Sequence, residues 1–119
     1  FLDLSGESYA GDADFMFGKD TLIFTGLAEH KDTFLEKMTL EQYTGYVISG
    51  NKLDCAAETY GSGYRFSYEK QSGDKVLSYV VATYEGPSCF WIFQFYCPKG
   101  DLEKNLPEID IILSAVRPA

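Results

Sequence analysis

The stretch CFWIFQFYC, residues 89–97, is the part of the chain that decides the fold. In an extended strand, alternate side chains point to opposite faces. One face then carries large aromatic side chains, those of Trp91, Phe93 and Phe95. The opposite face carries a second apolar set, Phe90, Ile92 and Tyr96. A strand that is apolar on both faces needs cover on both faces, so this stretch is predicted to be the central strand of a sheet.

The sequence on either side of this stretch predicts an antiparallel meander. Strand-like runs cover residues 53–60, 64–70, 75–85 and 88–97. The segments between them are rich in Gly, Pro and Ser, which favour turns: 61–63, 71–74 and 86–88. Short turns between successive strands are typical of an antiparallel meander.

The clearest helix signal covers residues 39–50. Thr39 followed by Gln42 matches a capping box, and Met38 with Tyr43 matches the hydrophobic staple that accompanies it. Gly50 is predicted to end this helix in the C′ position.

The last segment, NLPEIDIILSAVRP, predicts a second helix that begins at Asn105. Asn105 would cap it, and Pro107 would stand in the first turn, where proline is tolerated. A further strand is predicted over residues 21–29, and residues 1–20 are predicted to be an irregular or weakly paired lead-in. The sequence therefore predicts one α+β domain over residues 21–119, an antiparallel meander sheet with helices packed on it.

Charge and cysteine usage exclude several classes of function. The formal net charge of −8 argues against nucleic acid and anionic bilayers as partners, because both need a basic surface. Cys89 and Cys97 would lie on one face of a straight strand but roughly 26 Å apart, too far for a disulfide, whereas Cys55 could pair with either of them. With one histidine, His30, and no Cys-x-x-Cys pair, no metal site or cofactor is predicted.

No catalytic motif stands out, so we do not expect an enzyme. Asp12 and Asp14 resemble the start of a calcium loop, but Met16 and Ile23 occupy positions where such a loop needs oxygen ligands. No pairing of a nucleophile with His30 is favoured by spacing.

The nine tyrosines are the most informative feature for function. Tyrosine suits recognition surfaces, since its ring packs against a partner while its hydroxyl stays hydrated. A possible recognition surface is predicted from five of them, Tyr60, Tyr64, Tyr68, Tyr79 and Tyr84. The alternative is that these rings only cap sheet edges and pack under helices.

Two segments together resemble the PsbP-like superfamily. They are KDTFLEKMTLEQYTGYV (31–47) and FWIFQFYCPKGDLEKNLPEIDIILSAVRP (90–118), and the resemblance covers residues 21–117. The second segment is similar to short extracytoplasmic lipoproteins of Gram-positive gut bacteria, on the pattern F-x-F-x-C-P followed by I-L-x-S-[IV]-[RK]. The residues that carry it here are Phe93, Phe95, Cys97, Pro98, Ile112, Leu113, Ser114, Val116 and Arg117, with Ser114 one position before the serine of the pattern, where this chain has Ala115.

The resemblance implies an α/β/α sandwich and a protein that acts by binding partners, and no functional residue carries over. We therefore expect a non-enzymatic, exported or surface-tethered binding or accessory domain whose partner is a protein or a glycan. Membrane contact is expected only through a lipid anchor outside these residues. The alternative is a small-ligand pocket or enzyme of the cystatin-like or nuclear-transport-factor-like kind.

Overall fold

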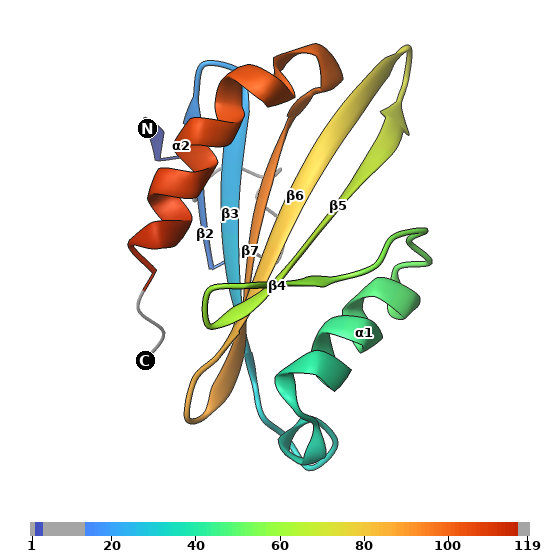
Figure 1. The fold of residues 1–119 in the computed structure, drawn as a ribbon, viewed down its shortest axis with the longest axis vertical. Coiled ribbons are helices and arrows are strands. Elements are labelled where there is room, and N and C mark those ends of the chain that lie inside the picture. Colours follow the sequence, from blue (N-terminus) through green and yellow to red (C-terminus); the bar gives the residue numbers. More distant parts are fainter. Residues whose placement is uncertain (1, 4–13, 117–119) are drawn as a thin grey trace.

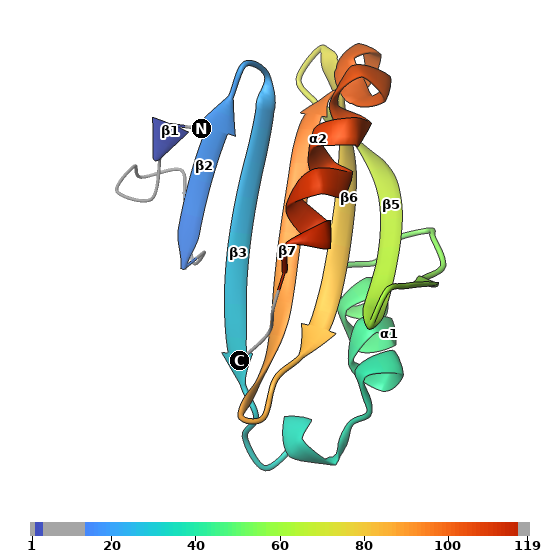
Figure 2. The ribbon, with the colours of Figure 1, turned by 60° about the vertical axis from the view of Figure 1, so that its left-hand side comes forward.

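The fold is built on one antiparallel sheet (Figure 1). A computed structural model describes residues 2–3 and 14–116. The strands are β1 (Leu2–Asp3), β2 (Phe15–Lys19), β3 (Leu22–His30), β4 (Glu58–Tyr60), β5 (Gly63–Ser72), β6 (Lys75–Glu85) and β7 (Cys89–Pro98). The helices are α1 (Leu40–Gly50) and α2 (Leu102–Ser114), each preceded by a 3-10 turn, η2 (Leu35–Lys37) and η3 (Lys99–Asp101). The seven strands lie in the order β1-β2-β3-β7-β6-β5-β4. Figure 2 shows this order from β1 to β5 from another side.

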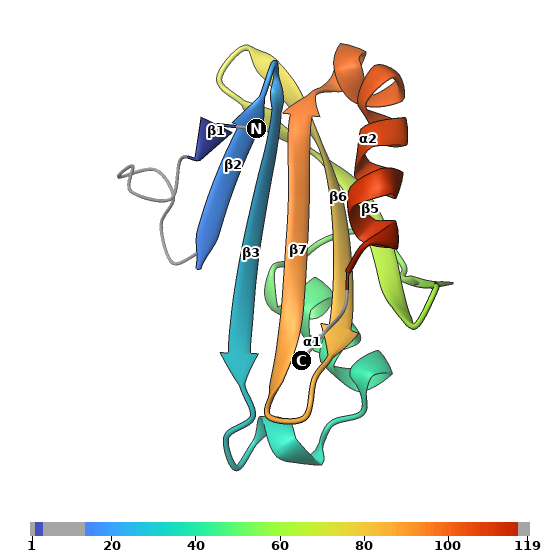
Figure 3. The same ribbon diagram turned by 90° about the vertical axis from the view of Figure 1, so that its left-hand side faces the viewer.

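The prediction of a central strand is confirmed. β7 pairs with β3 on one side and with β6 on the other. The two helices lie on opposite faces of the sheet, which we name the α2 face and the α1 face after them (Figure 3). On the α2 face, Phe93 and Phe95 are buried with Ile109 of the helix. On the α1 face, Phe90 is buried with Tyr43. The α+β class is therefore confirmed, and the two-sided apolar pattern of β7 has its cause in two separate cores.

The predicted capping box of α1 is present. The Thr39 hydroxyl accepts from the Gln42 amide at 3.1 Å, and the Gln42 side-chain oxygen accepts from the Thr39 amide at 3.0 Å. The predicted end of the helix was wrong: Gly50 is its last residue, and Lys52 takes the left-handed conformation with φ 55°. The Asn51 side chain donates to a carbonyl of the last turn at 2.8 Å, which lets the helix continue past the position expected for its end.

The predicted start of the second helix was also wrong. α2 begins at Leu102, because β7 passes through η3 directly into the helix. Asn105 lies inside the helix and is buried rather than acting as a cap, and Pro107 stands in the helix interior. Proline at this position removes the bond to the carbonyl of Glu103, a residue on the exposed side of the helix where water can bind that carbonyl instead.

The meander is confirmed in β5, β6 and β7, with a shorter first strand than predicted. Only Glu58–Tyr60 of the predicted run 53–60 pairs with β5. Within the predicted lead-in 1–20, residues Phe15–Lys19 form β2, which pairs with β3 over five residues and was not predicted as a strand. Residues 4–13, including Asp12, lie outside the described residues. None of the described helices is long and apolar enough to cross a bilayer.

Candidate functional site

Three tyrosines form a row across neighbouring strands on the α1 face. Tyr68 of β5 lies directly opposite Tyr79 of β6, which lies directly opposite Tyr96 of β7. The rings of Tyr68 and Tyr79 are parallel within 4°, with centroids 4.7 Å apart. The rings of Tyr79 and Tyr96 follow at 5.1 Å and 24°. We name these three residues the tyrosine stack.

The tyrosine stack lies on a part of the sheet that α1 does not cover. α1 packs near the C-terminal end of β6 and the N-terminal end of β7. There the Thr44 hydroxyl is hydrogen-bonded to the Thr83 hydroxyl at 2.6 Å, and the Tyr43 ring stacks on the Phe90 ring at 4.2 Å. Tyr79 is four residues from Thr83 along β6, a separation of about 13 Å in an extended strand. In Figure 1, α1 lies beside the lower half of the sheet, and no described helix packs over the upper half of this face. The three rings are partly exposed.

The structure brings together only two of the five tyrosines that the sequence nominated. Tyr68 and Tyr79 belong to the stack, and Tyr64 lies on the same face, opposite Thr83. Tyr84 lies on the α2 face and is 4% exposed, so its ring belongs to the core. Tyr60 lies on β4 and binds α2. Tyr96 completes the stack but was not nominated.

Two hydroxyls of the stack, those of Tyr68 and Tyr79, stay protonated at physiological pH. Burial raises the pKa of Tyr68 to about 12, with smaller contributions from its neighbours Tyr79 and Cys55. Burial also raises the pKa of Tyr79. The rings of Tyr68 and Tyr79 therefore each carry an uncharged hydroxyl, a group that can both donate and accept a hydrogen bond.

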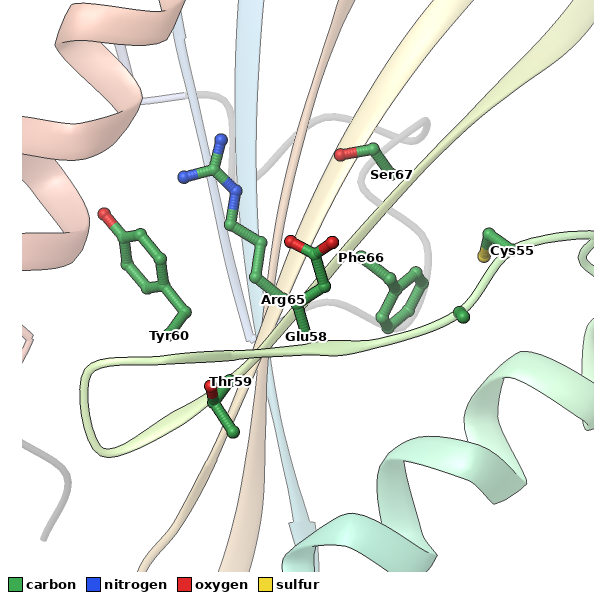
Figure 4. Close-up of a pocket in the computed structure, with 8 residues that line it drawn as sticks. Cys55, Glu58, Thr59, Tyr60, Arg65, Phe66 and Ser67 are labelled. Atoms are coloured by element: carbon green, nitrogen blue, oxygen red, sulfur yellow. The ribbon is translucent and has the colours of Figure 1, made fainter.

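A cleft opens at the edge of the sheet next to the tyrosine stack (Figure 4). It lies where β4 parts from β5 and has a volume of about 490 Å³. We name it the edge cleft, and the residues that line it are Cys55, Ala56, Glu58, Thr59, Tyr60, Arg65, Phe66 and Ser67. Phe66 links the two features, since its ring lies 6.3 Å from the ring of Tyr68.

One wall of the edge cleft is held in place by α2. Asp110 accepts from the Arg65 guanidinium at 2.9 Å and from the Tyr60 hydroxyl at 3.1 Å. The guanidinium also lies over the Tyr60 ring, 4.9 Å from its centroid. Burial and the Asp110 carboxylate raise the pKa of Tyr60. Arg65 is thus engaged in fixing the β4–β5 hairpin to the helix.

The other charged group of the edge cleft has no such partner. Glu58 is exposed, and among the described residues none forms an ion pair or hydrogen bond with its carboxylate. It lies directly opposite Arg65 and so on the same face of the sheet as Arg65 and Ser67. Cys55 lines the opposite side, where burial and the neighbouring Asp54 raise the pKa of its thiol and so keep it protonated at neutral pH.

The remaining residues considered from sequence do not converge on a site. All three cysteines are free thiols, with Cys89 and Cys97 buried, so neither disulfide open to Cys55 is formed. His30 is exposed at the end of β3, where its partner across the ladder is Cys89. Within residues 2–3 and 14–116, no group of three or more acidic, histidine or cysteine side chains is placed to hold a metal ion.

Comparison with protein-family models finds no match to this chain, and comparisons with curated proteins and with solved structures find none either.

Proposed function

We propose that this protein is a non-enzymatic binding domain that recognises a protein or glycan partner with the tyrosine stack. The observation that carries the proposal is the parallel array of Tyr68, Tyr79 and Tyr96 on the part of the α1 face that α1 leaves uncovered. Stacked rings on adjacent strands form a rigid surface, so a partner that binds there orders few side chains. The neutral hydroxyls of Tyr68 and Tyr79 supply hydrogen bonds at the rim of an apolar contact.

The proposal extends to fold family and location. We propose a PsbP-like α/β/α sandwich, which the helices on opposite faces and the element order β3-α1-β4-β5-β6-β7-α2 support. The resemblance of residues 21–117 to extracytoplasmic lipoproteins supports an exported or surface-tethered protein. The net charge of −8 supports a partner other than nucleic acid.

The experiment selects ligands on the wild-type protein and asks whether they need the stack. A displayed random peptide library and a glycan array supply the probes. Tyr79→Thr removes the middle ring and keeps a residue suited to a strand. Tyr46→Thr is the matched control, because Tyr46 is 45% exposed on α1 and outside the stack.

We expect ligands that bind the wild type and Tyr46→Thr equally but lose at least about tenfold in affinity with Tyr79→Thr, in keeping with removal of a central aromatic contact. Circular dichroism and a thermal melt establish that both variants are folded. The proposal would be overturned if Tyr79→Thr bound the selected ligands with the affinity of the wild type, or if the screens yielded no ligand.

The edge cleft supports the second candidate, a small-ligand site. Its volume of about 490 Å³ falls within the range of ligand pockets, and Glu58 supplies a free carboxylate. A fragment screen by NMR tests this reading, with Glu58→Gln as the variant. Fragments that bind in the edge cleft and depend on Glu58 would favour this candidate, and the absence of such fragments would contradict it.

A further inference from the structure

The outer edge of β5 is only partly paired. β4 pairs with Gly63, Tyr64 and Arg65 of β5, and the pairing stops at Arg65, which lies opposite Glu58, the first residue of β4. Residues 66–72 of β5 pair with β6 on their inner side, and no described strand lies on their outer side. Figure 4 shows the chain that precedes β4 running away from β5, so the edge cleft opens at the start of this free edge.

The register identifies the backbone groups that point outward. The residues that close a two-residue hairpin loop form a hydrogen-bonded pair, and such pairs alternate along an antiparallel ladder. The loop 73–74 joins Ser72 to Lys75, which turns the backbone groups of even-numbered residues of β5 toward β6. The loop 61–62 joins Tyr60 to Gly63, which turns those of odd-numbered residues toward β4.

Both hairpins therefore agree on the composition of the free edge. The N–H and C=O groups that face outward beyond β4 belong to Ser67, Glu69 and Gln71. No hydrogen bond recorded among the described residues occupies them. Unpaired edge groups of this kind are a template for an added strand.

We propose that this free edge binds an extended segment of a partner polypeptide as an antiparallel strand, with basic side chains alternating with apolar ones. The inference rests on the proposed binding function and names the kind of partner. Residues of the added strand opposite Ser67, Glu69 and Gln71 point to the α2 face, where the free carboxylate of Glu58 lies. Residues between them point to the α1 face, beside Phe66 and Tyr68.

Charge supports a basic partner over a second copy of this chain. The chain carries a net charge of −8, which attracts a cationic segment and repels another copy. The antiparallel register that pairs all of residues 66–72 with a second copy would also place Glu69 opposite Glu69, and like charges directly opposite each other are destabilising.

The test uses three forms of one synthetic peptide in which lysine alternates with valine and tyrosine, with both ends blocked. One form is unmodified. The second carries N-methyl groups on its lysines, whose N–H groups would bond to β5. The third carries them on its valines and tyrosines, whose N–H groups would point away. Because only the peptide changes, a loss of binding cannot come from a misfolded protein.

Backbone NMR titration of the protein provides the affinities and the binding site. We expect the unmodified peptide and the third form to bind alike and to shift the amide signals of Ser67, Glu69 and Gln71. The second form should bind at least about tenfold more weakly, since it loses several hydrogen bonds. Glu58→Gln should weaken binding, whereas Glu41→Gln, an equal change of charge on exposed α1, should not.

Equal binding of the second and third forms would overturn the proposal, as would peptide-induced shifts away from β5. A ligand-free dimer that already protects these amides would overturn it too. If soluble oligosaccharides bind the tyrosine stack and the peptide does not, the strand proposal fails while the binding function stands. If neither class binds, both fail.

Discussion

Replacing Phe95 with alanine should destabilise the protein strongly, because this side chain joins the central strand to the α2 core. Phe95 is 0% exposed, and its ring stacks on Phe24 at 4.5 Å and 7°. Truncation of a buried phenylalanine costs about 3–5 kcal/mol through lost burial and the cavity that remains. That is a large share of the roughly 5–15 kcal/mol by which a domain of this size is stable.

Urea denaturation followed by tryptophan fluorescence measures this cost. With a slope of about 2 kcal/mol per molar urea, the midpoint should fall by roughly 1.5–2.5 M. Phe34→Ala is the matched control, since Phe34 is 58% exposed, and its effect should stay within about 0.5 kcal/mol. Equal midpoints for the two variants would refute the assignment of Phe95, and with it the α2 face of β7, to the core.

Three further predictions concern other parts of the molecule. Gly26→Ala should lower the free energy of unfolding, because a Cβ there would overlap the ring of Phe15, whereas Gly45→Ala meets no atom within 4 Å and should raise it by up to about 1 kcal/mol. Spectroscopic titration should find that the pKa of Tyr68 is about 12 in the folded protein, above its ordinary value of 10.0. Because the folded state binds this proton more tightly than the unfolded state does, the contribution of Tyr68 to stability is complete below pH 10.0 and is lost as the pH rises towards 12. A thiol reagent should modify only Cys55 in the folded protein, faster at alkaline pH, and all three thiols in denaturant. These expectations would be contradicted by a higher melting temperature for Gly26→Ala, by tyrosines that all titrate near pH 10.0, or by rapid modification of the buried thiols.

The fold was predictable where local sequence and burial agree. The apolar faces of β7 indicate a central strand whatever its neighbours are, and the Thr39–Gln42 box is a local signal that needs no tertiary contact. The helix boundaries failed for the opposite reason. Asn105 has the composition of a cap, but the chain leaves β7 in a tight turn and is already helical three residues earlier.

The tyrosine stack was only partly predictable. Tyr79 and Tyr84 are an odd number of residues apart in one strand, so their opposite faces could have been deduced from period-two alternation. Tyr96 could not have been assigned to the stack in this way. Its place beside Tyr79 depends on the register between β6 and β7, which the length of the turn 86–88 sets and residue composition does not.

The edge cleft could not be predicted from the sequence, for a similar reason. Residues 53–60 have a strand-like composition throughout, yet only the last three pair with β5. The wall of the edge cleft also depends on Asp110 of α2, which binds Tyr60 and Arg65 and fixes the β4–β5 hairpin to the helix. Asp110 is 50 positions from Tyr60 and 45 from Arg65 in the sequence, so no local sequence pattern predicts these contacts.

The central claim is that the tyrosine stack is the recognition surface. It is tested most directly by NMR of the protein with ¹³C-labelled tyrosine rings, recorded with and without a ligand selected on the wild type. The account predicts that the ring signals of Tyr68, Tyr79 and Tyr96 shift together as the ligand saturates, while that of the buried Tyr84 stays in place. Shifts confined to rings outside the stack, such as Tyr46, would contradict it.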